Sequence, residues 1–324
     1  MNPAAAAIGT PSPSRPFDGL VAAVHTPFRD GPGGAGGALA VDVVPAQARH
    51  LAASGVSAVF VAGTTGEGSS LTLEEKRDLL SAWSPVGSGD VPGADLRVIA
   101  HVGGSCLADS IALAEHCAGL AGIEAVGAVA PSYLAPRTPA DLALSLQCII
   151  QAAKKPTYYY DIPVLTGIHF SAYELANAFA EHAPGLAGIK CTRFEGSELL
   201  DFVRFDGGRF DVLAGRDEAL LSALPLGIHG AVGSTYNFAA PLYLALMKAF
   251  AAGDLERAAT LQWQSVEMIR ALAALPFLPA CRRIMEHQGV PLGPPRLPLA
   301  PLTAAQNEQL DVLIAAAPWV PASA

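Results

Sequence analysis

A single charged side chain ends an otherwise apolar run in the second half of the chain. Residues 185–189 read Gly-Leu-Ala-Gly-Ile, a composition typical of a buried strand, and Lys190 follows at once. Burial disfavours the charged form of an amine, and a neutral lysine amine attacks carbonyl carbon to form a Schiff base. The alternative, which the strand taken alone favours, is a lysine whose stem is buried and whose ammonium reaches solvent.

A glycine-rich segment with two hydroxyl groups follows an earlier apolar run. Residues 63–68 read Gly-Thr-Thr-Gly-Glu-Gly. Glycines let backbone amides approach an anion closely, and the hydroxyls of Thr64 and Thr65 add donors, so the segment suits a carboxylate or a phosphate. The same residues also fit a turn into a helix that Thr72 and Glu75 would cap, and both interpretations can hold together.

Three consecutive tyrosines belong to another run. Because side chains alternate along a strand, Tyr158 and Tyr160 share one face and Tyr159 takes the other. We expect Tyr160 to face the same site as Lys190, where a phenol can move protons to and from carbonyl or hydroxyl oxygens. Aromatic packing between strands and helices is an adequate explanation of the other two.

Polar residues also follow two later runs. Residues 215–218 read Gly-Arg-Asp-Glu, and residues 233–237 read Gly-Ser-Thr-Tyr-Asn. The carboxylates of Asp217 and Glu218 can accept hydrogen bonds from a polyhydroxylated ligand. Taken singly, such a pair more often marks a helix N-terminus, where acidic side chains offset the helix dipole.

Eight short apolar runs must bring these residues together. Amphipathic stretches such as 107–118 and 139–153 separate the runs and are typical of crossover helices. Eight such alternations predict an α/β fold, the closed TIM (β/α)₈ barrel, in which the residues after the strands gather at one mouth. The runs are 20–24, 58–62, 98–102, 125–130, 157–162, 185–189, 210–214 and 230–232.

The rest of the chain flanks the predicted barrel, which we assign to residues 18–240. Residues 1–17, rich in Ala, Pro and Ser, predict a flexible tail without a signal peptide. Residues 241–324 predict a C-terminal helical extension. Its three helices are expected at 241–251, 255–272 and 279–288. No apolar run approaches the roughly 18 to 20 residues that span a bilayer.

Composition argues against several functions. The chain has 29 acidic and 20 basic residues, a formal net charge of −9, and no basic run longer than two residues, which disfavours a nucleic-acid partner. The five scattered cysteines lack a CxxC pair, which predicts reduced thiols and a cytoplasmic protein. The eight histidines show no HxH or HExxH spacing, so no metal is expected.

Five motifs, taken together and in this order, resemble those of the dihydrodipicolinate synthase/N-acetylneuraminate lyase family. They are GTTGE at 63–67, YDIP at 160–163, GIKCT at 188–192, GRDE at 215–218 and GSTYN at 233–237. The resemblance is greatest to the N-acetylneuraminate lyase branch. It implies a TIM barrel, usually a homotetramer, that acts as a class I aldolase through a lysine Schiff base with pyruvate.

The resemblance also implies roles for individual residues. Lys190 would form the Schiff base, Tyr160 would transfer protons, and Tyr133 stands where a neighbouring subunit often contributes a tyrosine. Thr64 and Thr65 would bind the pyruvyl carboxylate. The sugar chain would be held by Thr192, Gly215, Asp217, Glu218, Gly233 and Ser234.

Such an enzyme cleaves N-acetylneuraminate reversibly to N-acetylmannosamine and pyruvate without a cofactor. The alternatives are another pyruvate-dependent aldolase or dehydratase acting on 2-keto-3-deoxy sugar acids, and a noncatalytic protein that binds sialic acid or pyruvate. Leu165 stands where the family's synthases carry an arginine for a second carboxylate, which argues against their reaction. Asp161 replaces the usual Asn, and the segment 193–196 departs from the lyase pattern, so we expect this segment to reshape the sugar pocket.

Overall fold

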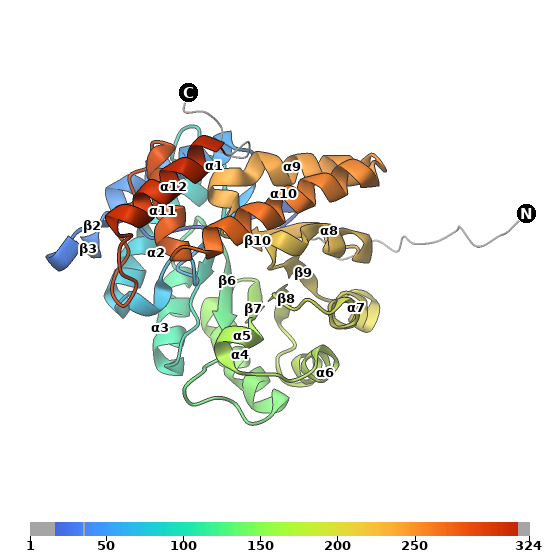
Figure 1. The fold of residues 1–324 in the computed structure, drawn as a ribbon. Coiled ribbons are helices and arrows are strands. Elements are labelled where there is room, and N and C mark those ends of the chain that lie inside the picture. The colour runs from blue at the N-terminus through green and yellow to red at the C-terminus, as the bar shows by residue number, and fades with distance from the viewer. Residues whose placement is uncertain (1–16, 35, 317–324) are drawn as a thin grey trace, which may run out of the picture.

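Eight parallel strands close into a barrel that helices surround (Figure 1). The structure is a computed structural model that describes residues 17–34 and 36–316. Each of the eight predicted runs forms one strand, which confirms the TIM barrel. The strands, in their order around the barrel, are β1 Gly19–Ala23, β10 Gly230–Gly233, β9 Asp211–Ala214, β8 Leu186–Cys191, β7 Thr157–Asp161, β6 Ile123–Val129, β5 Arg97–His101 and β4 Ala58–Val61.

Three of the helices between the strands begin at a capping box. In each of them a hydroxyl at the N-cap accepts a hydrogen bond from the amide three residues on, and the acidic side chain there accepts one in return. These pairs are Thr72 with Glu75, Thr138 with Asp141 and Ser171 with Glu174. The connecting helices are α1 Val44–Ala53, α2 Leu73–Gly87, α3 Leu107–Ala118, α4 Pro139–Ala153, α5 Pro163–Thr166, α6 Ala172–His182, α7 Gly196–Arg204 and α8 Leu220–Ala223.

Alternation along the strands sorts buried side chains into two cores. An inner core fills the barrel, and an outer core lies between the strands and the helices. Tyr160 is paired in register with Lys190, and Tyr159 lies in the outer core against Phe179. Tyr158 is not in the outer layer. It shares the inward face of Tyr160, belongs to the inner core, and donates a hydrogen bond to Asp211.

Four helices follow the last strand in the described residues up to 316, one more than the sequence predicts. They are α9 Tyr236–Ala251, α10 Leu255–Ala273, α11 Phe277–His287 and α12 Ala304–Ala316, and they lie together over one side of the barrel (Figure 1). The fourth was missed because α12 buries only Leu310 and Ile314, too narrow an apolar stripe to show in the sequence. The predicted boundary after residue 240 lies within α9.

A small antiparallel hairpin stands apart from the barrel. It pairs β2 Phe28–Asp30 with β3 Gly36–Leu39 between β1 and α1. Its glycine-rich sequence has no alternation of apolar and polar residues from which strands could be predicted. Except for Phe17, the predicted tail at 1–17 lies outside the described residues.

Candidate active site

A pocket of about 360 Å³ opens among the carboxyl ends of the strands. All but one of the residues predicted to form a site come from the ends of five of them, β4, β7, β8, β9 and β10; the exception, Tyr133, follows β6. Ten of the eleven line this pocket: Thr64, Thr65, Tyr160, Lys190, Thr192, Gly215, Asp217, Glu218, Gly233 and Ser234. The structure therefore brings these side chains together, while their roles stay predictions.

Lys190 is a buried residue of β8, 4% exposed, and its amine faces aromatic rings. Nζ lies 3.7 Å from the ring centroid of Tyr160 and 4.5 Å from that of Phe60. No carboxylate in the part of the chain that the structure describes lies within ion-pairing distance of this nitrogen. The ammonium is thus not committed to a salt bridge, and the amine can reach a ligand in the pocket.

Tyr160 is fixed from several sides. The rings of Phe60 and His101 pack edge-on against it, with centroids 5.7 Å and 5.9 Å away. Its phenolic oxygen lies 3.5 Å from Oγ1 of Thr64, at the limit of a hydrogen bond. A ligand oxygen between the two hydroxyls and the amine of Lys190 would therefore meet three groups able to exchange protons.

The loop after β4 carries the two threonines in a strained turn. Ala62 and Glu67 have φ of 61° and 52°, in the left-handed region, and a Cβ at Gly68 would lie 2.0 Å from the carbonyl oxygen of Ala62. The loop therefore requires glycine at this close approach. Oγ1 of Thr65 lies 2.6 Å from Oγ of Ser234, which joins the loop to the end of β10.

A buried ion pair, which the sequence did not reveal, holds this loop from behind. Glu67 Oε1 lies 3.0 Å from Nη1 of Arg282 in α11, and Glu67 Oε2 accepts a hydrogen bond from the amide of Arg296. Burial raises the pKa of Glu67, and the two arginines oppose that shift. Only the fold shows this contact, because more than 200 residues separate the partners.

Asp217 is a buried carboxyl group at the opposite side of the pocket. Its Oδ2 accepts hydrogen bonds from the amide and the hydroxyl of Thr235, at 2.8 and 2.6 Å. Burial raises the pKa of Asp217 to about 6, although the bonds from Thr235 favour the charged form. A Cβ at Gly233 would lie 1.9 Å from Oδ1 of Asp217, so glycine is required there.

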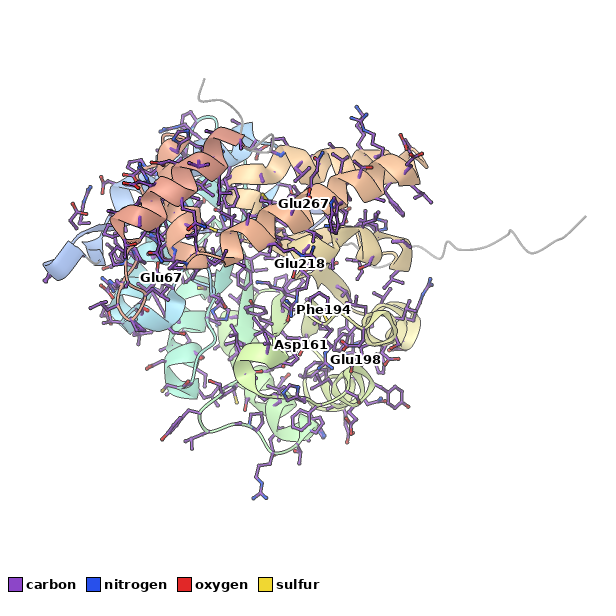
Figure 2. The ribbon with its side chains drawn as sticks, in the orientation of Figure 1. Glu67, Asp161, Phe194, Glu198, Glu218 and Glu267 are labelled. Carbon is purple, nitrogen blue, oxygen red and sulfur yellow. The ribbon has the colours of Figure 1, made fainter. Side chains whose placement is uncertain are left out.

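Several pocket residues escaped the sequence analysis. Arg216 lies beside Glu218, with its guanidinium 4.0 Å from the ring centroid of Phe194. Figure 2 labels these two neighbours, Phe194 and Glu218. The position of Arg216 inside the GRDE motif was the available signal. The apolar part of the wall could not be located from sequence, because helices far along the chain fold back over the barrel mouth; it includes Ile269 of α10 and Phe277 and Leu278 of α11.

One predicted residue and one predicted segment lie outside the pocket of this chain, and the role of Tyr133 in a neighbouring subunit stays a prediction. Tyr133 is 89% exposed and does not line the pocket of its own chain. The segment 193–196 does not line the pocket either, because Arg193 turns outward and forms an ion pair with Asp161 behind the barrel wall. The expected effect of this segment on the pocket is therefore indirect, through Phe194 beneath Arg216.

The described residues contain no group of three or more His, Cys, Asp and Glu side chains placed to hold a metal ion. All five cysteines are free thiols. Cys191 packs in the outer core, where burial raises its pKa, as the alternation from Lys190 predicts for a packing residue. None of the helices in the described part of the chain combines the length and apolarity needed to cross a membrane.

Comparison with known proteins gives consistent matches over most of the chain. The model of the dihydrodipicolinate synthetase family matches residues 16–317. The chain is 36% identical over 300 residues to an N-acetylneuraminate lyase of Danio rerio, covering 90% of this chain and 94% of that protein. It superposes on the Proteus mirabilis N-acetylneuraminate lyase with a TM-score of 0.87 and 32% identity, covering 94% and 99% of the two chains.

A synthase of the same fold matches less well in sequence. The dihydrodipicolinate synthase of Cyanidioschyzon merolae, solved with lysine bound, gives a TM-score of 0.82 with 28% identity over 94% of this chain and 99% of that one.

Proposed function

The chain belongs to the dihydrodipicolinate synthetase family, and on this premise we propose that it is a class I aldolase that cleaves N-acetylneuraminate reversibly to N-acetylmannosamine and pyruvate. The observation that carries the proposal is the amine of Lys190, buried, without a carboxylate partner among the described residues, and 3.7 Å from the ring centroid of Tyr160. The substrate comes from the names of the relatives: they are N-acetylneuraminate lyases, and each matches this chain over most of its length.

The reaction would begin with a Schiff base. The neutral amine of Lys190 attacks the C2 ketone of the open-chain sugar acid, and loss of water leaves an iminium. The carboxylate next to this carbon would receive hydrogen bonds from the hydroxyls of Thr64 and Thr65, which lie on the glycine-rich loop. The iminium then serves as an electron sink for the bond that breaks.

Cleavage between C3 and C4 would follow. Tyr160 would take the proton of the C4 hydroxyl, and the electrons of the C3–C4 bond move into the iminium to give an enamine. N-acetylmannosamine leaves with C4 as its aldehyde. Protonation of the enamine at C3 and hydrolysis of the resulting iminium release pyruvate and restore Lys190. The chemistry needs no cofactor.

The sugar chain would lie toward the wider part of the pocket. Asp217 and Glu218 can accept hydrogen bonds from its hydroxyls, and Thr192 and Ser234 can both donate and accept. Gly215 and Gly233 line the pocket with backbone atoms, which the chain could contact. Arg216, which also lines this part, adds a cationic donor.

We also propose a homotetramer, as the family resemblance implies. Tyr133 and Leu134 follow β6 with exposures of 89% and 81%, unusual for such side chains on a monomer. A neighbouring subunit could cover them, and Tyr133 could then reach the neighbour's site. The cytoplasmic location predicted from the free thiols remains a prediction.

The alternative is another pyruvate-dependent aldolase or dehydratase that acts on 2-keto-3-deoxy sugar acids, since the Schiff-base half of the site would be the same. Leu165, which lines the pocket, offers no charge for a second carboxylate and so disfavours the synthase reaction. A noncatalytic binding protein is less consistent with an unpaired amine beside a phenol.

Substrate comparison tests the proposal. The purified protein is incubated with N-acetylneuraminate and, separately, with 2-keto-3-deoxy-gluconate, and the pyruvate and aldehyde released are measured. We expect N-acetylmannosamine and pyruvate in equal amounts from the first. Pyruvate from the second compound alone would replace the proposed function by the alternative, and no pyruvate from either would leave a binding protein.

A further inference from the structure

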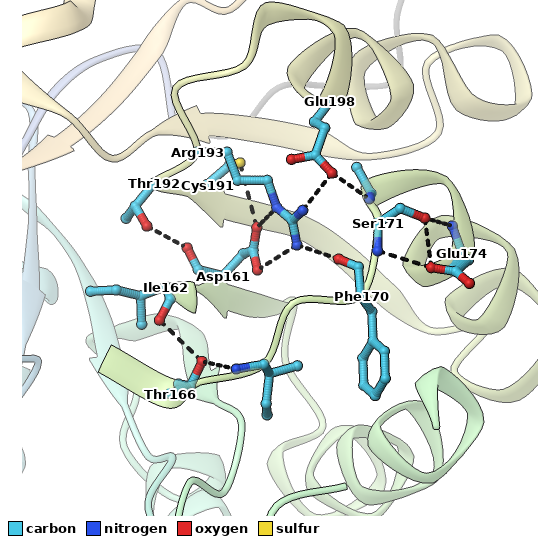
Figure 3. A network of polar contacts seen from close by, with 12 residues as sticks. Asp161, Ile162, Thr166, Phe170, Ser171, Glu174, Cys191, Thr192, Arg193 and Glu198 are labelled. Atoms are coloured by element: carbon cyan, nitrogen blue, oxygen red, sulfur yellow. Dashed lines mark hydrogen bonds and ion pairs between the residues drawn. The ribbon is translucent and has the colours of Figure 1, made fainter. Parts of the chain in front are cut away.

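A buried ion-pair network lies behind the barrel wall (Figure 3). Asp161 follows Tyr160 in β7, and Arg193 comes three residues after Lys190 of β8. Arg193 Nε lies 2.5 Å from Oδ2 of Asp161, and Arg193 Nη1 lies 2.6 Å from Oε1 of Glu198. The side chains of Asp161 and Arg193 are 1% and 6% exposed.

The guanidinium joins three separate parts of the chain. It pairs with the end of β7 through Asp161 and with the first turn of α7 through Glu198. Its Nη2 donates a 2.7 Å hydrogen bond to the carbonyl oxygen of Phe170, just before α6. Glu198 in turn accepts a hydrogen bond from the amide of Ala172. Each donor direction of Arg193 is therefore used, as a planar fork of donors allows.

The network continues the backbone pairing of the two strands. Asp161 and Cys191 are register partners whose side chains point outward, which turns Tyr160 and Lys190 inward. The amide and the hydroxyl of Thr192 both donate to the carbonyl oxygen of Asp161, at 3.0 and 2.9 Å. Beyond Thr192 the chain leaves the sheet, and the next side chain that ties it to β7 is Arg193.

We propose that Arg193 is a positioning residue, which, through Asp161 and Glu198, holds the ends of β7 and β8 so that the amine of Lys190 stays over Tyr160. This inference rests on the proposed function. It also gives a physical reason for two departures from the lyase pattern at once: the acidic Asp161 and the basic Arg193 are the two halves of one buried pair.

The buried pair lies close to residues that line the pocket. Asp161 and Tyr160 are consecutive, and Thr192, which lines the pocket, is fixed between its bond to Asp161 and a hydrogen bond from Nε of Arg216 to its carbonyl oxygen. Removal of Arg193 would leave a carboxylate buried without its partner, so the strand end would shift to reach water or another donor. A shift of about 1 Å in reacting groups can cost about 100-fold in rate.

Charge-neutral variants test the proposal. Arg193→Gln removes the charge from the centre of the network, and Arg193→Gln combined with Asp161→Asn removes both partners together. Glu174→Gln is the matched control: Glu174 is a nearby carboxylate of the α6 capping box, it does not contact Arg193, and glutamine also serves in such a box (Figure 3). Each protein is assayed for kcat and KM with N-acetylneuraminate and for thermal unfolding.

We expect R193Q to lose about 10- to 100-fold in kcat, measured well below its unfolding temperature, with KM changed much less. The double variant should lose no more than R193Q alone, because the fully buried carboxylate is then gone and Glu198, with its side chain 25% exposed, can be hydrated; E174Q should match the wild type. Wild-type kcat in folded R193Q, whatever its unfolding temperature, would reduce Arg193 to a purely structural residue and overturn the proposal.

Two further arms keep the test decisive. If R193Q does not fold, Arg193→Lys replaces it, since an ammonium keeps the charge but not the fork of donors; we expect a smaller loss of kcat, and wild-type kcat would again overturn the proposal. Borohydride trapping of wild-type protein with pyruvate separates the two levels of inference. If the wild type forms the adduct and R193Q keeps the wild-type kcat, only the positioning role is rejected. If the wild type forms no adduct, the proposed function itself is rejected.

Discussion

The amine of Lys190 lies in an aromatic setting rather than in a salt bridge. The ring faces of Tyr160 and Phe60 lie 3.7 and 4.5 Å from it, measured to the centroids. The amine is held in a buried site without a carboxylate partner among the described residues, where it can reach the carbonyl carbon of a ligand. This is the setting that Schiff-base formation requires.

Removal of the phenol should separate the two halves of the reaction. Tyr160→Phe keeps the ring beneath Lys190 but removes the group that takes the C4 proton. We expect kcat for N-acetylneuraminate cleavage to fall about 10²- to 10⁴-fold, while pyruvate still forms a borohydride-trapped adduct on Lys190. Cleavage by Y160F at the wild-type rate would assign proton transfer to another group.

Asp217 should leave a pH signature in stability. Burial raises its pKa to about 6 from the ordinary value of 3.8, so between these values the folded chain holds a proton that the unfolded chain has released. The contribution of this group to stability therefore falls as pH rises from about 4 to about 6. Asp217→Asn removes that contribution.

Urea unfolding of wild type and D217N at about pH 4 and about pH 7 measures this effect, with other titrating groups common to both proteins. From the lower to the higher pH, the free energy of unfolding of the wild type should fall relative to that of D217N. The expected fall is on the order of 2 kcal/mol. An equal difference between the two proteins at both pH values would contradict a raised pKa.

The position of a side chain could be predicted where the local sequence or the alternation along a strand determines it. Lys190, Tyr160 and Asp217 follow apolar runs, so the barrel alone brings them to one mouth. Arg216 and the pair Asp161–Arg193 could not be predicted in the same way. A guanidinium can turn into the pocket or away from it, and only the packing of α6 and α7 decides which.

At the scale of elements, the end of the chain supports the loop that carries Thr64 and Thr65. Arg282 is buried in α11, where it contacts Glu67 and also donates to the carbonyl oxygens of Thr26 and Leu292, at 2.9 and 2.6 Å. The strained turn at 62–68 is therefore held by a helix that follows the barrel. The C-terminal helices contribute to the site both as wall and as support.

If Arg282 supports the loop through Glu67, substitutions of two neighbouring arginines should differ in their effect on stability. Arg282→Gln leaves Glu67 buried without a charged partner, so we expect about 3–5 kcal/mol of destabilisation and a raised KM for pyruvate in adduct formation. Arg283→Gln is the matched control, because Arg283 makes only surface pairs at 40% side-chain exposure and should cost less than about 1 kcal/mol. Similar unfolding curves for R282Q and R283Q would show that Arg282 does not stabilise the loop at 62–68.

The elements themselves were predicted unevenly. The eight strands and helices α3 and α4 could be predicted, because their apolar periodicity is a local feature, as is the capping box of Thr138 and Asp141 in α4. The hairpin of β2 and β3 and helix α12 could not. Glycine-rich and weakly amphipathic segments take their structure from the surfaces they meet, here the guanidinium of Arg296, which donates to the carbonyl oxygen of Gly37 in β3, and the outer core around Leu310.

At the scale of the whole molecule, the exposed Tyr133 links assembly to activity. If a neighbouring subunit supplies this tyrosine, Tyr133→Ala and Lys190→Ala damage different halves of a shared site. Each variant alone should be strongly impaired. Co-expressed in equal amounts, they should regain about one quarter of wild-type activity, because half of the subunit pairs are hybrids and one of the two sites in each hybrid is intact.

Subunit mixing also reveals the opposite case. Full activity of Y133A alone, or no recovery in the co-expressed sample, would mean that each chain completes its own site. Size measurement of the wild type in solution accompanies the assay, since a monomer would exclude the shared arrangement.

The central claim is a covalent bond between Lys190 and the substrate's ketone carbon. Borohydride is added to the protein with N-acetylneuraminate and, separately, with pyruvate, and the modified peptide is located by mass spectrometry. We predict a pyruvyl adduct on Lys190 in both samples and none in Lys190→Ala. An adduct on another lysine, or no adduct while N-acetylmannosamine is released, would contradict the Schiff-base mechanism.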